Sequence, residues 1–108
     1  MEKQNKKLKK EINKLVEKAH EKELEKELSR LAKNFTEWQK KEMDSFELID
    51  KIHDFHDGTS REIWKRYHYM KSKLNLIALA IIEGNLNESE VSNELMKKLE
   101  PIIQLFKE

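Results

Sequence analysis

Histidine and aspartate crowd the middle of this 108-residue chain. Asp50 precedes His53 by three residues and Asp57 follows it by four, so a helix would place all three side chains on one face. Imidazole and carboxylate groups bind Zn, Mn or Fe, and helical bundles often hold such metals with a carboxylate three residues from a histidine. Glu17 and His20 form a second pair with this spacing.

A helical hairpin that brings the two pairs together would create a metal centre, as in a metal-dependent hydrolase. Its possible ligands are His53, His56, Asp57, Asp50, His20 and Glu17. A di-metal bundle needs two further carboxylates from other helices, and Glu62 and Glu83 have no histidine at the matching spacing. The alternative is a set of solvated acids with one structural histidine. We therefore assign no catalytic residue and no cofactor, and keep a divalent metal as an alternative.

Basic and aromatic residues alternate in the segment that follows, a composition suited to gripping phosphates and stacking on bases. The candidate nucleic-acid contacts are Arg61, Lys65, Arg66, Tyr69, Lys71 and Lys73. The net charge of +1 disfavours this function because it provides no global field to attract a polyanion. We expect the cations to pair with the acidic end of the preceding helix, with Trp64 and Tyr67 in the core.

Composition predicts the fold class. The chain has only 2 glycines and 1 proline, while Lys, Glu and Leu, which favour helices, dominate. No segment alternates as a strand would, so we predict an all-α protein with a single domain over residues 1–108. There are no cysteines, and the basic first residues are not followed by an apolar stretch. We therefore expect a cytoplasmic protein with no secretory signal and no membrane contact.

Periodicity and capping signals predict four helices, at residues 5–41, 45–57, 60–83 and 88–107. Asp44 with Glu47, Thr59 with Glu62, and Asn87 with Glu90 have the spacing of capping boxes. We expect Phe46, Ile49, Ile52 and Phe55 to line one face of the second helix. Asp57-Gly58 and Glu83-Gly84-Asn85 are expected to end helices with glycine in the left-handed conformation, and Pro101 to kink or restart the fourth helix.

The first helix changes its apolar face near residues 20–23. Leu8, Ile12 and Leu15 share one face, whereas Leu24 and Leu31 point to another. Either the helix breaks there, or its halves touch different partners, as when the first half reaches a neighbouring subunit. Short connections predict an up-down four-helix bundle with a long amino-terminal helix. We therefore expect a helical protein–protein interaction or oligomerisation module, pairing as a coiled coil or homodimer, rather than an enzyme.

Overall fold

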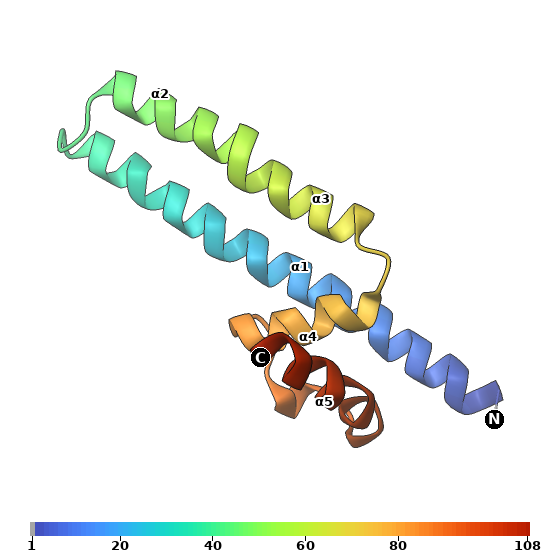
Figure 1. Cartoon of the computed structure of the whole chain (residues 1–108). Helices are drawn as coiled ribbons and strands as arrows, with labels where there is room; N and C mark the ends of the chain where they lie inside the picture. The colour runs from blue at the N-terminus through green and yellow to red at the C-terminus, as the bar shows by residue number, and fades with distance from the viewer. Residues whose placement is uncertain (1) are drawn as a thin grey trace. The chain divides into compact units, whose positions relative to one another are not determined.

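The computed structural model describes the backbone of residues 2–108 and the side chains of residues 6–108. Every regular element in this part of the chain is a helix, which confirms the all-α class (Figure 1). The elements are α1 (Glu2–Gln39), α2 (Ser45–Asp54), the π-helical segment η1 (Phe55–Ser60), α3 (Arg61–Tyr69), α4 (Lys73–Glu83), the 3-10 turn η2 (Glu88–Glu90) and α5 (Asn93–Lys107). None of the described helices is both long and apolar enough to cross a membrane.

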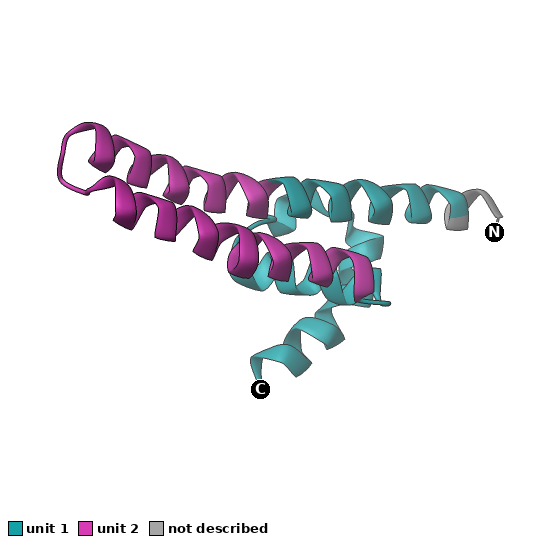
Figure 2. Cartoon of the chain, turned by 90° about the horizontal axis from the view of Figure 1, so that it is seen from above, with its two compact units in different colours: residues 1–21, 70–108 teal, residues 22–69 magenta. Residues whose placement is uncertain are grey.

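The chain divides into two compact units (Figure 2). Residues 1–21 and 70–108 form the terminal unit, and residues 22–69 form the hairpin unit. Helix α1 contributes its first part to the terminal unit and the remainder to the hairpin unit. A single domain over residues 1–108 stays a prediction.

The core of the terminal unit is built from α4 and α5, which pack on each other. Apolar residues occupy most of the circumference of α4, so this helix is buried on several sides. Its fully or nearly fully buried residues are Leu76, Ile77, Ala78 and Ala80, and those of α5 are Leu95, Leu99 and Ile103. Burial of so many aliphatic side chains is the main source of stability in this unit.

The change of apolar face along α1 follows from its membership of both units. The helix is unbroken from Glu2 to Gln39. Leu8, Leu15 and Ala19 are buried in the terminal unit. There the Glu11 carboxylate accepts hydrogen bonds from the Ser92 backbone N–H at 2.8 Å and from its hydroxyl at 2.7 Å. The first half of α1 thus packs on its own chain, and the change of face no longer argues for a neighbouring subunit.

The helix end predicted at Asp57-Gly58 is wrong. Helical backbone continues from α2 through η1 into α3, and Gly58 does not adopt a positive φ. Glycine permits the left-handed conformation without requiring it. Both flanking segments have side chains facing α1, including the buried Leu48 and Ile63, so packing keeps the backbone helical on each side. The glycine lies instead in a wider π-helical turn, and the helix start predicted at Thr59 is also wrong.

A break that the sequence did not predict divides residues 60–83 into two helices. Helix α3 ends at Tyr69 and α4 begins at Lys73. Ser72 caps α4, with its hydroxyl oxygen accepting a hydrogen bond from the Asn75 N–H at 3.2 Å. The apolar stripe from Ile63 to Ile81 continues across this break, which is why the pattern alone indicated one helix. The break coincides with the boundary between the two units.

Two capping predictions are confirmed in atomic detail. The Asp44 carboxylate accepts a hydrogen bond from the Glu47 N–H at 2.8 Å at the start of α2. Met43 and Leu48, which flank this cap, are both buried, as a hydrophobic staple requires. Gly84 ends α4 with φ +83°, in the left-handed region.

The fourth predicted helix begins later than expected. Asn87 and Glu90 form the predicted capping box, but it encloses only the 3-10 turn η2. Helix α5 begins at Asn93, where the Ser92 hydroxyl accepts a hydrogen bond from the Leu95 N–H at 3.3 Å. Pro101 lies inside α5, which continues to Lys107 without the predicted restart. Burial of residues on both sides of the proline offsets the lost backbone hydrogen bond.

Alanine substitutions at the two glycines are expected to have opposite effects. Gly58→Ala adds a methyl group within helical backbone with nothing within 4 Å, and should raise the free energy of unfolding by about 0.5–1 kcal/mol. Gly84→Ala adds the same group at a positive φ, and should lower it by about 1–2 kcal/mol. Urea unfolding of both variants measures the difference. Shifts of the same sign would contradict the conformations assigned to these residues.

Candidate functional site

An ion pair marks one edge of the hairpin unit, in which residues 22–39 of α1 run antiparallel to α2, η1 and α3 (Figure 1). The Glu23 carboxylate accepts hydrogen bonds from Arg66 Nη1 at 2.7 Å and from the Tyr67 hydroxyl at 2.9 Å. The Glu23 side chain is 12% exposed. We call this side of the hairpin the polar edge.

Apolar side chains of α1 turn toward the opposite edge. Leu28 and Phe35 follow Glu23 by 5 and 12 residues, which places them about 120–140° around the helix from it. Leu24 and Leu31 lie between these positions and are partly buried. They therefore face the second arm of the hairpin, which is formed by α2, η1 and α3. Leu28 is 51% exposed and Phe35 is 40% exposed. These two side chains lie outside the contact between the two arms.

The second arm also exposes a large aromatic side chain, that of Trp64. Trp64 precedes Arg66 by two residues, so it lies about 160° around α3 from the polar edge. The buried Ile63 lies between them and faces α1. Trp64 is 48% exposed. It therefore turns to the same side of the hairpin as Leu28 and Phe35.

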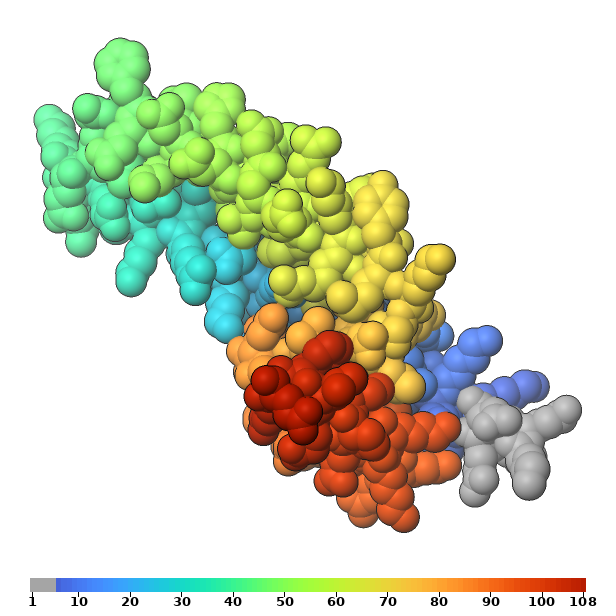
Figure 3. Space-filling model, in the orientation of Figure 1, coloured from blue at the N-terminus to red at the C-terminus, as the bar shows by residue number. Residues whose placement is uncertain are grey.

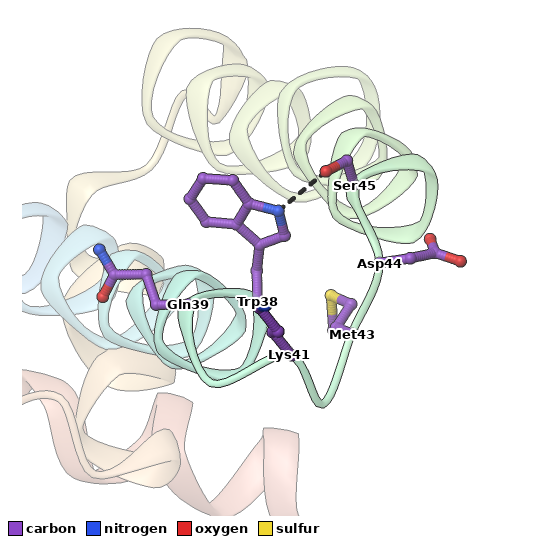
Figure 4. Close-up of a pocket in the computed structure, with 6 residues that line it drawn as sticks. All are labelled: Trp38, Gln39, Lys41, Met43, Asp44 and Ser45. Carbon is purple, nitrogen blue, oxygen red and sulfur yellow. Dashed lines mark hydrogen bonds between the residues drawn. The ribbon is translucent and has the colours of Figure 1, made fainter.

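Trp38 and Ile49 extend this surface to the closed end of the hairpin. Figure 4 shows the Trp38 indole reaching from α1 to α2, where Nε1 donates a hydrogen bond to Ser45 Oγ at 3.0 Å. Ile49 follows Ser45 by one helical turn and is exposed. The indole lines a hollow of about 640 Å³ at the α1–α2 connection, where Lys41 adopts a φ of 63°. The open face is defined by Leu28, Phe35, Trp38, Ile49 and Trp64.

Polar and aromatic groups border the open face beside Trp64. Its ring stacks on His68 with a centroid distance of 4.1 Å and meets Tyr69 edge-on at 5.5 Å. A smaller hollow of about 270 Å³ is lined by His56, Asp57, Ser60, Arg61 and Trp64. His56 follows Ile49 by two helical turns, so the two residues lie on the same side of the second arm. Because His56 lines the same hollow as Trp64, Ile49 lies on the side of Trp64. The border thus combines hydrogen-bonding groups with a large exposed ring.

The proposed metal ligands are spread over both units. His56 Nδ1 lies 3.2 Å from Asp57 Oδ1, while His53 and Asp50 are exposed on α2. Glu17 and His20 belong to the terminal unit. Among the side chains of residues 6–108, no group of three His, Asp or Glu lies close enough to hold a metal ion.

The proposed nucleic-acid contacts are also divided. Arg61, Lys65 and Tyr69 are exposed in the hairpin unit. We expected the cations of this segment to pair with α2, but Arg66 pairs with Glu23 of α1. Lys71 and Lys73 belong to the terminal unit, where Lys73 Nζ donates a hydrogen bond to Asn13 Oδ1 at 2.7 Å.

Sequence reasoning did not identify the open face. Phe46 and Ile49 were expected to share one apolar face of the second helix, and they are 85% and 52% exposed. Trp64 was expected as a core anchor. Figure 3 shows side chains of the α2 region standing clear of the surface. One feature of the sequence indicates such exposure: the apolar residues of 45–69 occupy more of the helix circumference than one antiparallel neighbour can cover.

Comparison with known protein families, curated proteins and solved structures finds no match for this chain.

Proposed function

We propose that this chain is a helical protein–protein interaction or oligomerisation module that binds its partner through the open face of the hairpin unit. One observation carries the proposal. Five large apolar side chains, three of them aromatic, are exposed on one side of two antiparallel helices, opposite a polar edge. Soluble monomers rarely expose contiguous apolar patches unless the patch binds something.

The hairpin unit lacks a closed core of its own. Its buried apolar residues are Met43, Leu48 and Ile63. Two antiparallel helices bury only the stripe between them, whereas a bundle of four encloses a core. Two further helices laid on the open face would bury its side chains and complete such a core. The up-down four-helix bundle predicted within the single chain stays a prediction, and we propose that the hairpin unit completes a four-helix core by association with a partner.

The chemistry of the open face also suits recognition. Trp is among the residues that contribute most to binding energy at interfaces, because it buries a large area at a small entropic cost. Trp38 and Trp64 lie toward opposite ends of the open face, with Phe35 and Leu28 on α1. Gln39, Asp57 and Arg61 are exposed around these apolar groups. An apolar centre with a polar rim is the usual organisation of a protein interface.

Site-specific photo-crosslinking in the native cells tests the proposal. A benzophenone side chain is placed at position 35 or 64 on the open face, and at the exposed Arg30 as a control away from it. We expect discrete adducts from positions 35 and 64, and only background from position 30. A Leu28→Ser/Ile49→Ser background should remove at least nine-tenths of the adduct, because it makes the apolar surface polar.

Either kind of adduct supports the function: one with a second copy, or one with a different protein of defined mass. Equal background labelling from all three positions would overturn it, as would adducts that persist undiminished in the Leu28→Ser/Ile49→Ser background. Circular dichroism of the purified double variant provides the folding control. Leu28 and Ile49 are each about half exposed, so their loss should leave the helix content unchanged.

A further inference from the structure

We infer that the partner at the open face is a second copy of this chain, packed antiparallel about a two-fold axis that passes near η1. The inference rests on the proposed function and specifies its partner. Two properties of the hairpin unit carry it. One is the distribution of charge along its second arm, and the other is the symmetric placement of its exposed apolar side chains.

The second arm carries opposite net charges at its two ends. Residues 45–57 contain four carboxylates and one lysine, a net charge of −3. Residues 61–69 contain three cations and one carboxylate, a net charge of +2. Helical backbone runs without interruption from Ser45 to Tyr69, so the acidic end and the basic end lie along one rod with η1 between them.

Two-fold symmetry turns this asymmetry into complementarity. In a two-fold interface, residue i of one copy meets residue j of the other, and residue j meets residue i. Antiparallel packing therefore sets the acidic end of each copy beside the basic end of the other, twice over. Parallel packing would bring like charges together, which opposes association. Asp57 and Arg61 line the hollow beside Trp64, close to the proposed axis.

The apolar side chains are arranged about the same level of the hairpin. The Trp38–Ser45 and Glu23–Arg66 contacts join the two arms near their ends. Halfway between these contacts, positions 30–31 of α1 lie level with positions 55–56 of the second arm. Leu28 and Phe35 lie on either side of this level on α1, as Ile49 and Trp64 do on the second arm.

A two-fold axis at that level exchanges the members of each pair. Ile49 of one copy then meets the region of Trp64 in the other, and Leu28 meets the region of Phe35. The interface would thus place an aliphatic side chain against an aromatic ring in each case. An unrelated partner would require no such symmetry in the surface that it covers.

A charge-exchange experiment on the full chain tests this arrangement. The acidic variant R61E/K65E makes both ends of the second arm negative, and the basic variant D50K/D57K makes both ends positive. Sedimentation equilibrium should show a dimer for the unmodified chain and at least a tenfold weaker dimer for each variant alone. An equimolar mixture should recover the original affinity, and native mass spectrometry should show the mixed dimer. The matched control K26E/K33E reverses two exposed charges on the outer side of α1 and should dimerise normally.

The outcomes separate the inference from the proposed function. A dimer that is lost in Leu28→Ser/Ile49→Ser but is indifferent to the charge variants overturns the antiparallel arrangement and leaves the function standing. A chain that stays monomeric up to millimolar concentration overturns the second copy as partner. Crosslinked adducts with a different protein would then still support the function, and their absence would remove both. Circular dichroism of each variant, together with recovery on mixing, excludes misfolding as the cause of weaker association.

Discussion

Replacing Leu99 by alanine is expected to lower the free energy of unfolding by about 2–5 kcal/mol, the usual range for a fully buried leucine. Leu99 has no exposed surface, and Ile77 and Leu95 are equally enclosed. Truncation removes the transfer free energy of three carbon atoms and leaves a cavity between α4 and α5. Because these helices form the core of the terminal unit, we expect Leu99→Ala to lower the free energy of unfolding of this unit more than any single substitution on the surface.

Leu105→Ala in the same helix is the matched control. Leu105 is 68% exposed, so its truncation should change the free energy of unfolding by no more than about 0.5 kcal/mol. Urea unfolding followed by circular dichroism measures both variants. A loss below about 1 kcal/mol for Leu99→Ala would contradict close packing at this position.

Glu23→Ala is expected to destabilise the hairpin unit by up to about 1.5–3 kcal/mol, the range for hydrogen bonds to a charged group. The substitution removes the acceptor of both the Arg66 guanidinium and the Tyr67 hydroxyl. The Arg66 side chain is 36% exposed, so water screens part of the loss. The effect should still be large for this unit, because few apolar side chains are buried between its arms.

Two further variants separate the contributions to that effect. Glu23→Gln keeps an acceptor for the Tyr67 hydroxyl and should lose less than Glu23→Ala. Glu27→Ala removes the surface pair between Glu27 and Arg30, whose atoms lie 3.0 Å apart, and should change stability by no more than about 1 kcal/mol. Hydrogen exchange of α3 amides reports on the hairpin unit directly. Equal protection of these amides in Glu23→Ala and the unmodified chain would show that the contact does not hold the arms together.

Local signals in the sequence predicted much of the secondary structure. The caps at Asp44 and Gly84 are confirmed because each depends on a side chain or a backbone conformation within one helical turn. The capping box at Asn87 is also present, but it encloses a single 3-10 turn. A box describes how a turn begins and contains no information on how far the helix continues.

The candidate site was harder to predict, because it depends on which residues remain uncovered. The periodicity of Phe46, Ile49 and Ile52 indicates an amphipathic helix. It contains no information on how many other helices pack against the apolar face. With α1 as its neighbour in the hairpin unit, the second arm buries Leu48 and leaves Phe46 and Ile49 exposed. The proposed metal site, whose two pairs of ligands belong to different units, stays a prediction.

The sequence alone determined the helical class and several helix caps, through residue composition and interactions a few residues apart. Only the tertiary structure decided that Gly58 continues a helix, that residues 70–72 interrupt one, and that α1 serves two units. Glycine, proline and an apolar stripe each permit more than one backbone path, and the difference between these paths is about 1–3 kcal/mol. Burial of one or two aliphatic side chains supplies a free energy of that size, so packing over the whole chain makes the choice.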